Sequence, residues 1–256
     1  MLLRRMIDHV RAQNWLAVGL DFVIVVVGVF IGIQLGNLNE ARVERETGYA
    51  YLALIADEME GQADEYSQVV GQAKGRLEDL EYVAGVLDDP ARAAGDPEGF
   101  LAAIYFSRYR SYFPPPMNVY EGLESSGDIS LLPQIEVLSK IRQHYSDIER
   151  WNDVMDSSKN TWLRYGEAVT GYLSAEQMAA ILAGAPGPPA GLEGYTGEEA
   201  VALATRMADD RALMFALPVV RDYHNSSRDL AGNLEVKTRA LLVEVNAALG
   251  RPEGTE

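Results

Sequence analysis

The sequence predicts an all-α protein with an N-terminal transmembrane helix followed by an elongated antiparallel helical bundle. Between residues 16 and 35 the only polar side chains are Asp21 and Gln34, and twenty helical residues extend for about 30 Å, the thickness of the hydrocarbon core of a bilayer. After this run, apolar residues recur at steps of three and four over long stretches, and no stretch alternates with a period of two. Such spacing favours amphipathic helices and no sheet.

The first segment, residues 1–14, is predicted to be a cytoplasmic amphipathic segment, and the transmembrane helix is predicted over 15–36. Apolar side chains lie on one arc of the first segment, and charged side chains lie on the other. The residues that we expect at the membrane interface are Arg4, Arg5, Arg11 and Trp15.

The charges that flank the apolar run predict its orientation. A basic excess is found only on its N-terminal side, so the positive-inside rule places the N-terminus in the cytoplasm. The rest of the chain then lies in the periplasm, outside a bacterial inner membrane. The apolar run exceeds the roughly 7–15 residues of a signal-peptide core, and no A-x-A-like cleavage site follows it. We therefore expect an uncleaved anchor.

Three glycines recur within the span at intervals of four residues: Gly28, Gly32 and Gly36. Small residues in this register leave a shallow face that lets two helices approach closely, so they predict self-association or packing on a partner helix. Asp21 falls on the same face, since it lies two helical turns before Gly28. This carboxylate is either a functional intramembrane group or an interface residue that pairs with Arg11 or with an arginine of a neighbouring chain.

Residues 37–250 are predicted to form an extracytoplasmic helical bundle, followed by a tail over 251–256. Apolar seams predict three long helices over 38–87, 133–172 and 196–250. Short helices are expected near 100–109 and 117–125, and a glycine- and proline-rich loop over 183–195. The first long helix either continues from the span or breaks at residues 36–37, and Pro218 is expected to kink or restart the last one.

The charge balance restricts the classes of partner. Three of the 22 Lys and Arg residues and two of the 38 Asp and Glu residues lie in the first 36 positions, so the remainder carries 19 bases and 36 acids. Such an acidic domain is unsuited to binding nucleic acid and is repelled by anionic lipid head groups. The absence of cysteine excludes disulfides and thiolate chemistry. The expected partners are the bilayer and a second copy or another membrane protein.

The sequence offers no set of catalytic, cofactor-binding or metal-ligating residues. It lacks the Glu-x-x-His spacing of di-iron bundles, a phosphate-binding loop and a nucleophile elbow. His144 and His224 fall on apolar seams and are expected to be core residues. Aromatic side chains are expected to fill the bundle, with a ligand pocket between helices as the alternative. A solvent-exposed face is expected for the acidic residues Asp57, Glu58, Glu60, Asp64 and Glu65.

Residues 13–42, QNWLAVGLDFVIVVVGVFIGIQLGNLNEAR, resemble the opening of a widespread family of bacterial single-pass membrane proteins that is catalogued only as a domain of unknown function. A weaker similarity covers residues 119–132, VYEGLESSGDISLL. The resemblance implies a membrane-anchored helical protein, and it implies no activity and no catalytic residue.

These observations favour a non-enzymatic interaction or scaffold protein that self-associates or packs on a membrane partner. One alternative is an extracytoplasmic sensory or ligand-binding module. Another is an accessory subunit of an ion-coupled membrane complex that uses Asp21, since the layout is similar to that of the plug-like subunits of proton-driven stators.

Overall fold

The computed structural model describes residues 15–133, 135–185, 189–192 and 194–251, and every regular element among them is a helix. The protein is therefore all-α, as predicted. The predictions for residues 1–14, including Arg4, Arg5 and Arg11, lie outside the described residues. The same is true of tail residues 252–256 and of the side chain of Trp15, whose backbone begins the first described helix.

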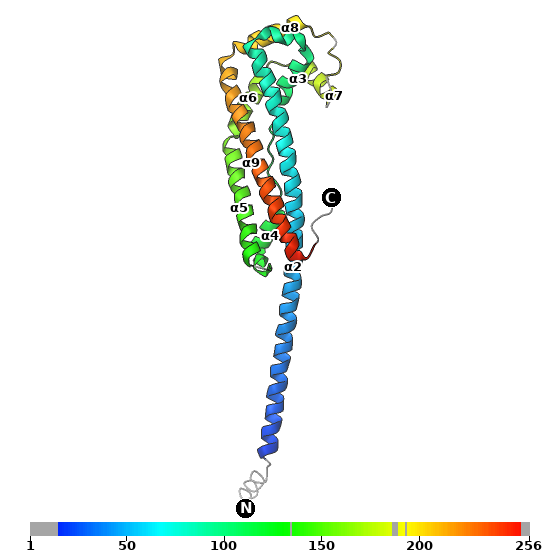
Figure 1. The fold of residues 1–256 in the computed structure, drawn as a ribbon, viewed down its shortest axis with the longest axis vertical. Coiled ribbons are helices and arrows are strands. Elements are labelled where there is room, and N and C mark those ends of the chain that lie inside the picture. The colour runs from blue at the N-terminus through cyan, green and yellow to red at the C-terminus, as the bar shows by residue number, and fades with distance from the viewer. Residues whose placement is uncertain (1–14, 134, 186–188, 193, 252–256) are drawn as a thin grey trace, which may run out of the picture.

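Helix α2 spans Trp15–Asp88, 74 residues without interruption, and is about 110 Å long at 1.5 Å per residue. Its N-terminal part projects beyond the bundle as a single rod (Figure 1). The helix continues through Gly36 and Asn37, which answers the question that the sequence left open. No proline interrupts the segment, and Pro90, which disfavours helical geometry in the residue before it, follows its end.

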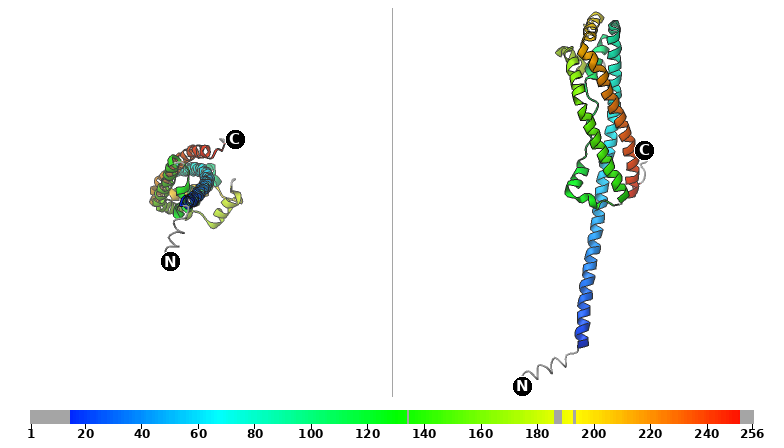
Figure 2. Two further views of the ribbon diagram at one scale, coloured as in Figure 1. Left: turned by 90° about the horizontal axis from the view of Figure 1, so that it is seen from below. Right: turned by 90° about the vertical axis from the view of Figure 1, so that its left-hand side faces the viewer.

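The other elements form a bundle around the C-terminal part of α2 (Figure 2). Helix α9 runs antiparallel along α2, and α5 runs beside α9 (Figure 1). Between α3 and α4, residues 110–117 have no regular structure and pass along the inside of the bundle; we call them the inner strap. The elements after α2 are η1 Pro90–Gly95, α3 Pro97–Ser107, α4 Asn118–Ser126, η2 Asp128–Leu131, α5 Ile135–Ser157, α6 Lys159–Thr170, α7 Ala175–Gly184, α8 Gly197–Ala208 and α9 Arg211–Leu249.

The middle helix, predicted to be continuous over 133–172, is divided into α5 and α6. The hydroxyls of Ser157 and Ser158 both donate to the carbonyl oxygen of Val154, at 2.7 and 3.2 Å. These side chains compete with the backbone donors that would continue the helix, which explains the break.

The last helix also divides, but not at the residue that we predicted. Asp210 caps α9 by accepting hydrogen bonds from the amides of Ala212 and Leu213, so the helix begins at Arg211. Pro218 lies inside α9, and the expectation that it restarts the helix is wrong. The Asp210 carboxylate satisfies the first amides of the helix, whereas Pro218 removes only one later donor.

Buried side chains form two clusters along the axis of the bundle. The first, nearer the projecting rod, joins α2, α4, α5 and α9 around residues such as Met59 and Tyr145. The second, at the far end, joins α2 to α3, α6, α7, α8 and α9 around residues such as Phe100 and Met207. Trp162 packs against both, so the two clusters are continuous.

Gly48 marks the point where the bundle begins on α2. It is buried, and a Cβ built on it would overlap the carbonyl oxygen of Leu131 at the end of η2. The close approach of α2 to this backbone therefore requires glycine. Gly61 lies on the exposed side of the same helix, and a Cβ built on it would meet nothing within 4 Å among the described residues.

We expect Gly48→Ala to lower the free energy of unfolding by about 1–3 kcal/mol, the usual cost of forcing extra atoms into a packed site. The matched variant Gly61→Ala should raise it by about 0.5–1 kcal/mol, because alanine favours an exposed helix interior. Denaturation midpoints of the two variants measure the difference. Equal effects would show that α2 does not approach η2 at Gly48.

Candidate functional site

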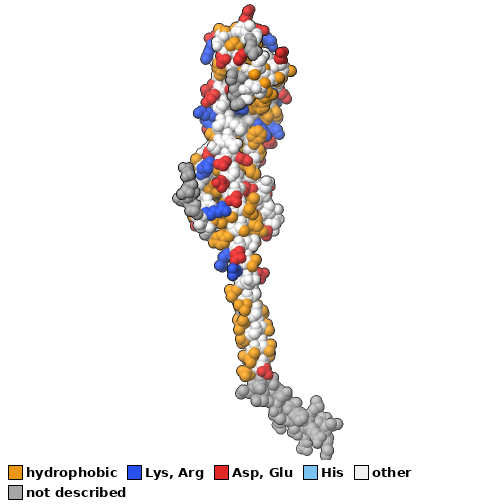
Figure 3. Space-filling view, turned by 90° about the vertical axis from the view of Figure 1, so that its right-hand side faces the viewer, with side chains coloured by type: hydrophobic (Ala, Val, Ile, Leu, Met, Phe, Trp, Pro, Cys, Tyr) orange, Lys and Arg blue, Asp and Glu red, His pale blue; other side chains and the backbone are white. Residues whose placement is uncertain are grey.

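The projecting part of α2 is an exposed apolar surface. Its most apolar 18-residue window is wholly unburied by the rest of the described chain, and side chains such as Phe22, Phe30 and Leu35 are more than half exposed. Figure 3 shows this rod as mainly hydrophobic, with charged side chains gathered where it meets the bundle. By length and composition, α2 is a helix that can span a membrane.

The structure brings the predicted glycines together on one face of this rod. Among the described residues, a Cβ built on Gly28, Gly32 or Gly36 would meet nothing within 4 Å, so packing within that part of the chain explains none of them. Asp21 lies in the same helix and is exposed, and the regular helix places it on this face, two turns before Gly28. Arg11, its expected partner, lies outside the described residues.

The glycine face points away from the side of α2 that packs into the bundle. At 100° per residue, the 27 residues between Gly28 and Ile55 place the two side chains about 180° apart. Ile55 is fully buried. Val43, which is half exposed, lies only two turns after Gly36 and therefore extends the glycine face toward the bundle.

Glu58 was predicted to lie on a solvated acidic face, and the structure corrects this. Its carboxylate accepts hydrogen bonds from the amides of Val119 (2.7 Å) and Tyr120 (3.3 Å) and from the hydroxyl of Tyr145 (2.5 Å). Helix α4 has no side-chain cap of its own, so Glu58 supplies the cap from α2. Burial, followed by the hydrogen bond to Glu58, raises the pKa of the Tyr145 hydroxyl, which therefore remains a donor.

The two histidines hold opposite ends of the inner strap. His144 donates from Nε2 to Gln62 Oε1 (2.8 Å), and the amide nitrogen of Gln62 donates to the carbonyl of Pro116 (2.6 Å). At the other end, Ser111 donates to Ser227 and accepts from His224 Nδ1 at 3.0 Å. Both histidines are core residues, as predicted, and both act through hydrogen bonds to neutral groups.

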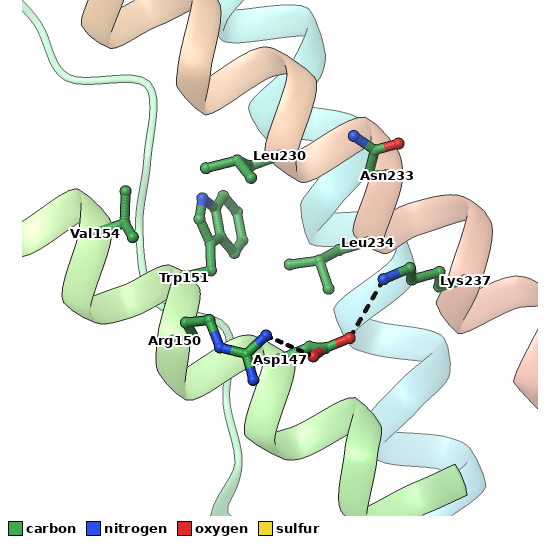
Figure 4. Close-up of a pocket in the computed structure, with 8 residues that line it drawn as sticks. All are labelled: Asp147, Arg150, Trp151, Val154, Leu230, Asn233, Leu234 and Lys237. Carbon is green, nitrogen blue, oxygen red and sulfur yellow. Dashed lines mark hydrogen bonds and ion pairs between the residues drawn. The ribbon is translucent and has the colours of Figure 1, made fainter.

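A groove lies between α5 and α9 (Figure 4). Its volume is about 330 Å³, and its walls include Leu230, Leu234 and the indole of Trp151. Asp147 bridges the helices, because its carboxylate contacts Arg150 at 3.4 Å and Lys237 at 3.3 Å. Burial acts to raise the pKa of Asp147, but hydrogen bonds from Gln143 and Lys237 hold that pKa below its usual value, so the bridge is ionic at neutral pH.

The part of the chain that the structure describes contains no group of three or more histidine or acidic side chains arranged to hold a metal ion. Comparison of the chain with protein-family models, with curated proteins and with solved structures finds no match.

We expect Glu58→Ala to lower the free energy of unfolding by about 2 kcal/mol, because it leaves two amides and a buried hydroxyl without their acceptor. Glu60→Ala, two residues away on the exposed side of α2, is the matched control and should change it by less than about 0.5 kcal/mol. Urea titrations of both variants provide the measurement. A Glu58→Ala variant as stable as the control would contradict the capping role.

Because His144 and His224 are buried, we expect the free energy of unfolding to fall in acid. Burial lowers the pKa of His144 and of His224 to about 4 in each case, whereas the unfolded chain takes up these protons near pH 6.5. The unfolded state therefore binds more protons between pH 6.5 and 4, and stability falls as the pH drops through this window, by about 3 kcal/mol for each histidine.

Denaturation midpoints between pH 7.5 and 4.5 test this prediction. His144→Gln, whose amide does not titrate, should remove about half of the destabilisation that the two histidines cause in acid. Asp79 acts in the opposite sense, since burial raises its pKa to about 6, and the variant Asp79→Asn isolates its effect. A pH profile that His144→Gln leaves unchanged would contradict the prediction.

Proposed function

We propose that the protein is a membrane-anchored, non-enzymatic assembly protein whose single span packs its glycine face against a second copy of the chain or against another membrane protein. The observation that carries the proposal is the unburied apolar part of α2, on which three glycines share an open face. In a bilayer, close backbone contact and packing favour association at such a face.

The position of the bundle supports association between two copies. The buried side of α2 lies opposite the glycine face, so two spans can meet without displacing either bundle. The continuous helix also means that association in the membrane orients the bundles relative to each other. A bacterial inner membrane, with the bundle in the periplasm, is the location that the arginines before the span favour.

Asp21 favours one alternative, an accessory subunit of an ion-coupled complex. It is exposed on the glycine face, where an association partner would cover it, and an ionisable group in that position is costly unless it is paired or used. Asp21→Asn separates the two functions: unchanged assembly and unchanged ion-dependent growth would exclude a role for this carboxylate.

We expect Gly32→Leu to abolish the oligomer in mild detergent, because a branched side chain holds the two backbones apart. Val23→Leu, on the opposite side of the span, is the matched control and should leave the oligomer intact. Light scattering of the purified full-length protein measures the mass. Oligomers that persist in Gly32→Leu would show that the glycine face is not the contact.

The natural chain contains no cysteine, so a single introduced cysteine reports which faces meet. Val43→Cys should form an intermolecular disulfide in oxidised membranes. Val154→Cys, half exposed on α5, should remain monomeric. Efficient cross-linking of the second variant but not of the first would contradict the proposed arrangement.

A further inference from the structure

We propose that the groove between α5 and α9 binds a small amphipathic anion, with an aromatic or apolar body and a carboxylate group. Binding in this groove does not require self-association, because residues of a single chain form all of its described walls. It would give the extracytoplasmic bundle a ligand of defined chemistry.

The charged side chains at the opening of the groove, which we call the rim, favour the binding of an anion. Two cations, Arg150 and Lys237, share the single carboxylate of Asp147. The Asp147 side chain is only 17 % exposed, whereas those of Arg150 and Lys237 are 69 % and 66 % exposed, so both cations retain free N–H groups toward solvent. The rim is therefore cationic in a chain whose net charge is −16. A carboxylate completes this arrangement by forming charge-assisted hydrogen bonds.

The indole of Trp151 provides a second and independent observation. The side chain is 97 % buried, lines the groove and stands between the two helices with its nitrogen beside Leu230 (Figure 4). Its Nε1–H has no acceptor among the described residues. A buried donor left unpaired is costly, so a ligand whose carboxylate oxygen moves Leu230 aside and accepts this hydrogen bond gains affinity.

The apolar walls and the volume of the groove restrict the chemistry and the size of the part of the ligand that lies inside it. Leu230, Leu234 and Val154 provide apolar surface beside the indole, which suits a ring or a short alkyl chain. The volume of about 330 Å³ lies at the small end of the range for small-molecule sites. A phosphate dianion fits less well, because Asp147 already uses part of the positive charge at the rim. A nucleic acid is repelled by the acidic bundle.

The test uses the full-length protein in phosphatidylcholine nanodiscs, with Trp15→Phe and Trp162→Phe substitutions so that Trp151 is the sole tryptophan and is excited selectively. The probe is 4-iodobenzoate, a heavy-atom quencher with a carboxylate. We expect saturable quenching of Trp151, and binding of the uncharged 4-iodobenzamide at least tenfold weaker. Quenching that rises linearly without saturation, or equal affinity for the two probes, would overturn the proposal.

Two further variants locate the site. Lys237→Gln should weaken 4-iodobenzoate binding at least fivefold. Lys140→Gln is the matched control, because Lys140 also pairs α5 with α9, at 2.6 Å to Glu244, but does not line the groove; it should leave binding unchanged. An equal loss in both variants would assign the effect to general charge and overturn the proposal.

Removal of the indole donor tests the contact with Trp151. In Trp151→Phe, the thermal stabilisation that 4-iodobenzoate gives the otherwise natural chain should fall by at least half. An undiminished shift would overturn the assignment of Nε1 as a donor to the ligand. If Trp151→Phe does not fold, the comparison of Lys237→Gln with Lys140→Gln still decides the proposal. The mass of the oligomer, measured by light scattering, does not depend on the outcome of either binding experiment.

Discussion

The structure depends on the continuity of α2, because one helix provides both the apolar rod and one wall of the bundle. Every side chain on it has a fixed rotational position relative to every other. The face that carries Gly28 is therefore fixed relative to the face that carries Ile55, and the bundle cannot turn independently of the rod. A flexible linker at residues 36–37 would have removed this coupling. Because α2 is continuous there, the packing of the rod determines the orientation of the bundle.

Polar contacts in the interior determine how the bundle is closed. The inner strap carries backbone groups into a core that offers few acceptors or donors, and such groups must be paired when water is excluded. Gln62 pairs the carbonyl of Pro116, Ser111 is paired by His224, and Glu58 caps the helix that follows the strap. Because these partners come from α2 and α9, they hold the strap and the helix after it against both long helices.

Much of this architecture could be predicted from the sequence, because periodicity of apolar residues reports which face of a helix is buried. The apolar span, the seams of the long helices and the core positions of His144 and His224 all follow from local spacing. The break after Ser157 and the role of Glu58 do not. Glu58 stands in a run of acidic residues, and its partner Tyr145 lies 87 positions away, so only the tertiary structure separates it from its solvated neighbours.

Helix α9 links the two proposed sites. It forms one wall of the groove through Leu234 and Lys237, and it packs along α2 over most of the length of the bundle (Figure 1). Because α2 continues without a break, α9 packs on the same helix that carries the glycine face. One chain forms the whole groove, and the glycine face is open on the projecting rod, so each feature is complete without the other.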